Sequence, residues 1–165
     1  MTAKPIIELK SIKVHTGLSE ETPAYTAKLF VDGKHFADVS NQGHGGCDLV
    51  YAPNGIQAGF ADRISTLEAQ IAATYPKHSC GDGYPPMDEC LEILCHNAAW
   101  TFVEQRNMKS RLSRTVMTFE DGKVYTWKGK KTEERMNAVA AKKPDAIILN
   151  RLAFAEAWTL IQDAA

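Results

Sequence analysis

The chain is short of cysteine and of net charge, and each shortage removes a class of protein. Four cysteines in 165 residues, at positions 47, 80, 90 and 95, are too few and too scattered for a disulfide scaffold, which leaves reduced thiols or a metal site. Nineteen basic residues against 20 acidic ones give a formal charge of -1. This balance lacks the basic field that phosphate binding needs and the acidic excess of a nucleic-acid mimic, so we do not expect a nucleic-acid partner.

Long apolar runs are also missing. The first eight residues, Met1 to Glu8, lack the apolar centre of a secretion signal, and nowhere do about 18 apolar residues follow one another. We therefore expect a cytoplasmic protein with no membrane contact. A composition of 44% hydrophobic and 24% charged residues is typical of a globular domain, and we expect residues 1–165 to form a single one. Nothing in the sequence indicates an oligomeric state.

Basic residues do gather locally, in two short clusters of three. The clusters consist of Lys109, Arg111 and Arg114, and of Lys128, Lys130 and Lys131. Clusters of this size are usually solvated edges, so they do not change the expectation for nucleic acid.

Apolar periodicity predicts an α+β fold. Alternation and turn dipeptides predict strands over residues 6–15, 24–31, 35–40, 112–119, 124–127 and 146–149. Asp32-Gly33 and Asp121-Gly122 are the dipeptides favoured in type I′ hairpin turns. Helical spacing predicts helices over 56–74, 85–106, 132–141 and after a capping Asn150. We expect antiparallel hairpins that form one or two small sheets packed against three or four helices.

The best candidate site is the segment from Asn41 to Asp48. It places three glycines within four positions, directly after the second arm of a predicted hairpin, where they favour positive φ or close approach of the backbone to a ligand. Three roles stay open: a structural loop, contact with a ligand or partner, and catalysis by Cys47 with His44 as its base. The loop matches neither the dinucleotide nor the P-loop fingerprint. The candidate binding residues are Asn41, Gly43, His44, Gly45, Gly46, Cys47 and Asp48, with Asp82 and Tyr84 of a second loop as a further wall.

A zinc site is a weaker alternative. Thiolate and imidazole are the ligands that zinc prefers, and the candidates are His78, Cys80, Cys90 and His96. Cys90 and Cys95 lie about 140° apart around one predicted helix, and no Cys-x-x-Cys pair occurs. Cys95 also belongs to the predicted buried stripe of that helix, with Leu91, Ala98 and Phe102. Packing is therefore the simpler explanation of these residues, and we expect no cofactor.

Two stretches resemble a family of small uncharacterised proteins carried by phages, prophages and plasmids. These are the hairpin Tyr25 to Lys34 and the loop Asn41 to Gly46, so the resemblance covers the first 55 residues, with a looser likeness around Ala146 to Asn150. It implies a context and no activity: accessory proteins of mobile elements commonly bind a host factor or a defence component. The sequence thus favours a non-enzymatic anti-defence protein that binds a protein partner. The alternatives are a small enzyme or binding domain for a nucleotide-like or other anionic molecule, and a structural zinc protein.

Overall fold

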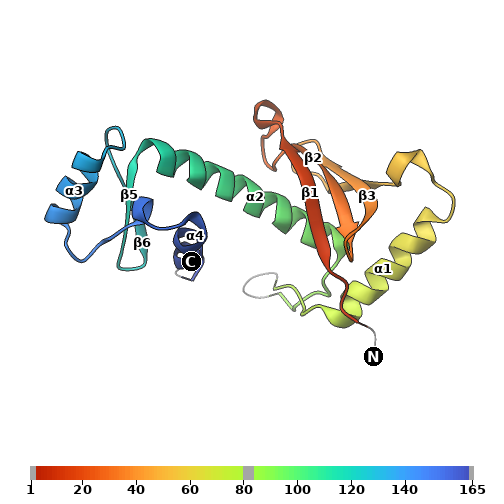
Figure 1. Ribbon diagram of the computed structural model, residues 1–165. Coiled ribbons are helices and arrows are strands. Elements are labelled where there is room, and N and C mark those ends of the chain that lie inside the picture. Colours follow the sequence, from red (N-terminus) through yellow and green to blue (C-terminus); the bar gives the residue numbers. More distant parts are fainter. Residues whose placement is uncertain (1–2, 80–83, 164–165) are drawn as a thin grey trace. The chain divides into compact units, whose positions relative to one another are not determined.

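The computed structural model describes residues 3–79 and 84–163, and these residues form an α+β fold (Figure 1). They contain four α-helices and two small antiparallel sheets, as predicted. The helices are α1 (Phe60–Thr74), α2 (Leu91–Arg114), α3 (Glu133–Lys142) and α4 (Phe154–Gln162). The strands are β1 (Ile7–Val14), β2 (Tyr25–Val31), β3 (Lys34–Asn41), β4 (Leu49–Tyr51), β5 (Val116–Glu120), β6 (Lys123–Trp127) and β7 (Ile147–Ile148).

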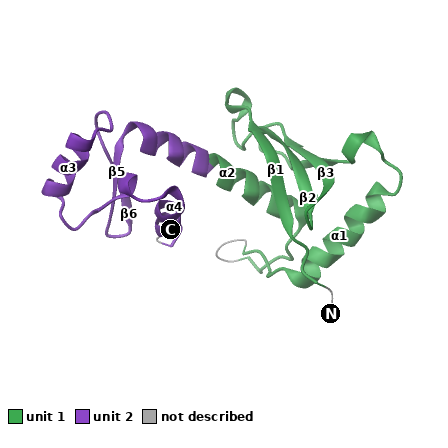
Figure 2. Cartoon of the chain, in the orientation of Figure 1, with its two compact units in different colours: residues 1–103 green, residues 104–165 purple. Residues whose placement is uncertain are grey.

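The chain divides into two compact units, residues 1–103 and 104–165, with the boundary inside α2 (Figure 2). Each unit contains one of the two sheets. The first sheet has the strand order β1-β2-β3-β4, and the second has the order β6-β5-β7. The expectation of a single domain stays a prediction.

The first sheet has one covered face and one open face. Alternation along β2 and β3 places the apolar side chains on the covered face, where they pack against α1 and the first part of α2. This core contains Tyr25, Ala27, Leu29, Ala37, Val39, Leu67, Ile71, Leu91 and Cys95. The polar alternation of the same strands faces away from the helices, so the open face carries mostly polar side chains.

Both predicted hairpin turns have the backbone that their sequences favour. Asp32 and Gly33 have φ values of 50° and 77°, and Asp121 and Gly122 have values of 51° and 73°. Positive φ at both central residues is the requirement of a type I′ turn. The turns therefore set the register of β5 with β6 and that of β2 with β3 next to the turn, while an irregularity between Leu29 and Phe30 shifts the register of β2 with β3 further along.

Two predicted helix starts are wrong. Helix α1 begins at Phe60 because Gly59 before it has a left-handed φ of 66°, and Ile56 lies outside the helix with its side chain 65% exposed. Helix α2 begins at Leu91 instead of at the two prolines. Its first backbone N–H donates to the Glu68 carboxylate of α1 at 3.1 Å, a tertiary contact that no local pattern reveals.

The predicted end of α2 near Arg106 is wrong as well, because the helix continues to Arg114. Met108 is buried in the core of the second unit with Met117 and Leu149. Burial of this side chain outweighs the weak helix propensity of Asn107. Phe102, predicted to be buried, is exposed, and Ala99 takes its place in the core.

Asn150 does not cap the last helix, which begins after Ala153. Its side chain lies instead at the centre of the second unit. The side-chain amide donates to the carbonyl oxygens of Leu112 and Thr115 at 2.8 and 2.9 Å, and its oxygen accepts from the Met117 N–H at 2.7 Å. Asn150 thus joins the end of α2 to the start of β5.

Candidate functional site

The loop between β3 and β4 contains Asn41 to Asp48, and its shape depends on the buried side chain of Asn41. The Asn41 amide donates to the Gly46 carbonyl at 2.9 Å and to Asp48 Oδ1 at 2.8 Å. Its oxygen accepts from the Gly43 N–H at 2.8 Å and from the Thr22 hydroxyl at 2.9 Å. One side chain therefore satisfies both ends of the loop and ties it to the segment before β2.

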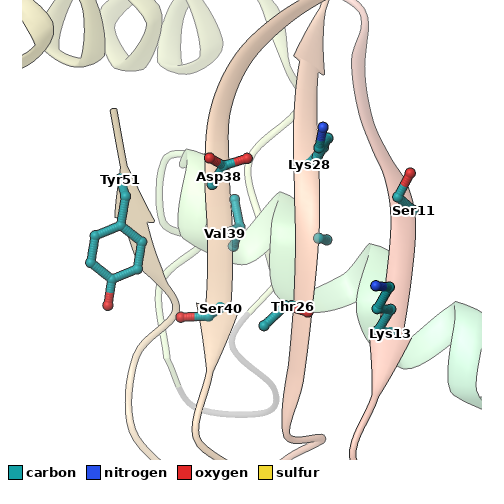
Figure 3. Close-up of a pocket in the computed structure, with 9 residues that line it drawn as sticks. Ser11, Lys13, Thr26, Lys28, Asp38, Val39, Ser40 and Tyr51 are labelled. Carbon is teal, nitrogen blue, oxygen red and sulfur yellow. The ribbon is translucent and has the colours of Figure 1, made fainter. Parts of the chain in front are cut away.

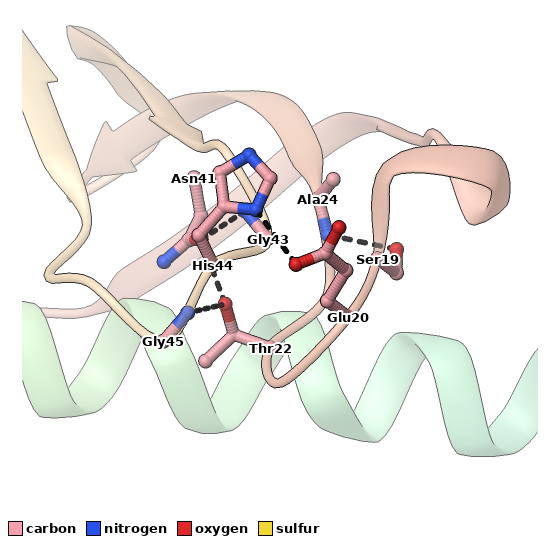
Figure 4. Close-up of polar contacts among 8 residues, drawn as sticks. All are labelled: Ser19, Glu20, Thr22, Ala24, Asn41, Gly43, His44 and Gly45. Atoms are coloured by element: carbon pink, nitrogen blue, oxygen red, sulfur yellow. Dashed lines mark hydrogen bonds and ion pairs between the residues drawn. The ribbon is translucent and has the colours of Figure 1, made fainter.

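Gly43 makes three of the hydrogen bonds between the loop and that segment; Figure 4 shows its position. Its carbonyl oxygen accepts from three successive backbone N–H groups, those of Glu20, Glu21 and Thr22, at 3.0, 3.1 and 3.4 Å. Its φ is 91°, and a Cβ at this position would collide with the Leu18 carbonyl. Gly43 is therefore required both for its backbone conformation and for its lack of a side chain.

The loop does not form an open anion-binding nest. The Gly43 N–H donates to Asn41 Oδ1, and the Gly45 N–H donates to the Thr22 hydroxyl at 3.3 Å. An anion would need such N–H groups to converge on an empty concavity. Here two of them are satisfied by the protein's own oxygen atoms, and Gly43 supplies an acceptor to the neighbouring segment instead.

Asp48 closes the loop from inside the core. Asp48 is 8% exposed, and its Oδ2 atom accepts a hydrogen bond from the Tyr25 hydroxyl at 2.7 Å. Burial, together with this hydrogen bond and the charge of Asp48, raises the pKa of Tyr25 well above its usual value. The buried pair and Asn41 thus form a continuous polar network beneath the loop.

The two candidate catalytic residues are not arranged as nucleophile and base. His44 Nδ1 lies 3.2 Å from Glu20 Oε2, so the imidazole pairs with a carboxylate on the surface. Cys47 is exposed, and a hydrogen bond to the Glu92 carboxylate together with its negative charge raises the pKa of the thiol. A nucleophilic cysteine needs the opposite shift, which a neighbouring cation or imidazolium provides. The geometry therefore favours a role for His44 and Cys47 as exposed contact residues over a role in nucleophilic catalysis.

Residues of the loop line a shallow, open cavity of about 300 Å³. Its walls come from Asn41, Gln42, His44, Gly46, Cys47 and Leu49. Of the expected second wall, Tyr84 is exposed and does not line this cavity, and Asp82 lies outside the described residues. The second wall therefore stays a prediction.

The candidate zinc ligands do not form a cluster in the described ranges. Within residues 3–79 and 84–163, no three His, Cys, Asp or Glu side chains lie close enough together to hold a metal ion. Cys80 falls outside these ranges. Cys95 is completely buried, and burial raises the pKa of its thiol to about 12. It is a core residue, in agreement with its predicted place on the buried stripe of α2.

The open face of the first sheet, which was not among the predicted site residues, forms a further surface (Figure 3). It contains a hollow of about 560 Å³ whose lining includes two lysines, an aspartate, three hydroxyl side chains and a tyrosine. These residues are Lys13, Lys28, Asp38, Ser11, Thr26, Ser40 and Tyr51. The polar alternation of strands β2 and β3 was the available signal, because it marks one uncovered face.

Comparison with known proteins identifies no matching family model, no similar curated protein and no similar solved structure. None of the helices in the described part of the chain combines the length and the apolar character that crossing a membrane requires.

Proposed function

We propose that the protein is a non-enzymatic binding protein of a mobile genetic element, which acts by engaging a host or defence protein. The observation that carries the proposal is the geometry of the loop. The buried polar groups of the loop are satisfied by hydrogen bonds within the protein. His44 and Cys47 are exposed and do not form a catalytic pair. The resemblance of the first 55 residues to proteins of phages and plasmids supports the biological context.

The surface next to the loop has the composition of a docking site. Leu49 and Tyr51, on the short edge strand β4, are 41% and 47% exposed. Leu49 and Tyr51 lie two and four positions after Cys47 in the chain, and Leu49 lines the same cavity as His44 and Cys47. Interface centres are enriched in aromatic and apolar side chains, with polar groups around them. We therefore assign the partner surface to His44, Cys47, Leu49 and Tyr51, and call it the β4 surface.

A rigid loop also lowers the cost of binding. The Asn41 network and the triple hydrogen bond to the Gly43 carbonyl hold the backbone in one conformation before any partner arrives. Each segment that is ordered in advance loses less conformational entropy on association. The glycines of the loop thus hold the backbone of a surface that the partner protein contacts.

Site-specific photo-crosslinking in cells tests the proposal. The photoreactive amino acid p-benzoylphenylalanine is introduced in place of Tyr51 and, as a control, in place of Ala72, which is exposed on α1 at the covered side of the sheet. We expect a discrete crosslinked protein from position 51 and none from position 72. Equal crosslinking from both positions, or turnover of a small molecule that needs Cys47, would contradict it.

A further inference from the structure

The two units carry opposite charge, which the near-zero total of the chain conceals. Residues 1–103 contain seven Lys and Arg against 12 Asp and Glu, a formal charge of -5. Residues 104–165 contain 12 Lys and Arg against eight Asp and Glu, a formal charge of +4. The near-zero total charge therefore does not exclude a nucleic-acid partner for the second unit taken by itself.

The fold also brings the two basic clusters of the sequence together. The Lys131 N–H donates to the Arg114 carbonyl at 2.9 Å, so the loop between β6 and α3 contacts the end of α2. The Arg111 guanidinium donates to the Thr126 hydroxyl at 2.7 Å, and Arg135 donates to the Lys128 carbonyl. The resulting basic patch consists of Arg111, Arg114, Lys128, Lys130, Lys131 and Arg135.

No residue of the basic patch is paired with a carboxylate in the described part of the chain. All six residues are exposed. Elsewhere in the same unit, Lys143 pairs with Glu120 and Arg151 pairs with Glu133. The ion pairs of this unit therefore involve Lys143 and Arg151, which do not belong to the patch.

We propose that the basic patch binds the phosphate backbone of a DNA duplex without reading its sequence. Three of its six residues are arginines, whose planar guanidinium groups match phosphate oxygens in a bidentate manner. All six of its residues are cationic, whereas a protein interface needs apolar side chains at its centre and a membrane surface needs them for insertion. A duplex presents closely spaced phosphates to such a surface.

Fluorescence anisotropy with the full-length protein and a labelled 20-base-pair DNA duplex tests this proposal. At physiological salt we expect a dissociation constant of roughly 1–100 µM that falls steeply as the salt concentration is lowered. The substitutions Arg114→Gln and Lys131→Gln, made together, should weaken binding at least tenfold. They should also make the logarithmic salt dependence shallower by about two, because two phosphate contacts are lost.

A matched control removes the same charge from the same unit. Lys123→Gln with Lys142→Gln changes two exposed lysines at the far ends of β6 and α3, and should leave both affinity and salt dependence nearly unchanged. The pair Lys128→Gln and Lys130→Gln repeats the test within the patch at two exposed loop residues. Absence of duplex binding up to about 100 µM protein would overturn the proposal. So would equal effects of patch and control variants, or equal affinity for the single strand or for a polyglutamate peptide.

Discussion

Gly43 and Gly46 are both glycines of the same loop, yet only one of them is required by the geometry. Gly43 has a positive φ and lies against the Leu18 carbonyl, whereas an added Cβ at Gly46 would meet no atom within 4 Å. The sequence shows three glycines of equal standing. The requirement depends on a contact with residues that lie more than 20 positions earlier in the chain, and this contact has no local signature.

Gly43→Ala is expected to lower the free energy of unfolding by about 2 to 4 kcal/mol. The left-handed backbone costs about 1–2 kcal/mol for alanine, and displacing the Leu18 carbonyl adds a similar amount. Gly46→Ala, the matched control, should change stability by less than about 0.5 kcal/mol. Urea denaturation of both variants measures the difference, and equal stabilities would refute the structural role of Gly43.

Cys95 predicts how stability depends on alkaline pH. An unfolded thiol ionises near its ordinary pKa of about 8.5, whereas the buried one keeps its proton until the pH approaches about 12. Because the pKa is raised in the folded state, the contribution is complete below about pH 8.5 and is lost as the pH rises toward 12. Between these limits each unit of pH should cost up to about 1.4 kcal/mol for this one proton.

Denaturation between pH 9 and pH 11 checks this expectation. Cys95→Ala should unfold more easily near pH 8, but its stability should fall less steeply than that of the wild type as the pH rises. Tyr25, whose raised pKa acts in the same direction, is present in both proteins and cancels in the comparison. Parallel curves for the two proteins would show that the thiol does not contribute.

The hairpins and the helices differ in how far local sequence determines them. The two Asp-Gly turns are specified by two residues each, so both hairpins could be predicted. The start of α2 depends on Glu68, which lies 23 positions earlier. The end of α2 depends on burial of Met108 in the core of the second unit. Ends that depend on tertiary contacts of this kind could not be predicted from periodicity alone.

Asn150 is the residue that fixes the junction of α2 with β5. Asn150→Ala removes three hydrogen bonds and leaves the Met117 N–H without its partner in a buried strand, which should cost about 1 to 3 kcal/mol. Asn107→Ala on the exposed side of α2 is the control, since its side chain makes no hydrogen bond to a described residue. Thermal unfolding of the two variants measures the effect. An Asn150→Ala protein as stable as the control would exclude this role.

For the molecule as a whole, apolar periodicity predicted the fold class, but the total composition concealed the distribution of charge. The formal total of -1 is the sum of an acidic unit and a basic one, and the boundary between them lies inside a helix, where no linker composition marks it. Of the candidate site, the sequence identified the loop itself and its exposed residues His44 and Cys47. It did not identify Asn41 as the centre of a buried network, because that role depends on Thr22 and Asp48.

We propose that the protein works by docking at the β4 surface and not by chemistry at Cys47. The most direct measurement is the affinity of the crosslinked partner for two variants, Cys47→Ser and Leu49→Asp. Serine preserves the size of the side chain but removes the thiol, whereas aspartate places a charge where apolar contact is expected, at a cost of about 2 kcal/mol or more. We expect Cys47→Ser to bind the partner with an affinity within threefold of the wild type, and Leu49→Asp to bind it at least tenfold more weakly. Loss of function in Cys47→Ser with unchanged binding by Leu49→Asp would contradict it.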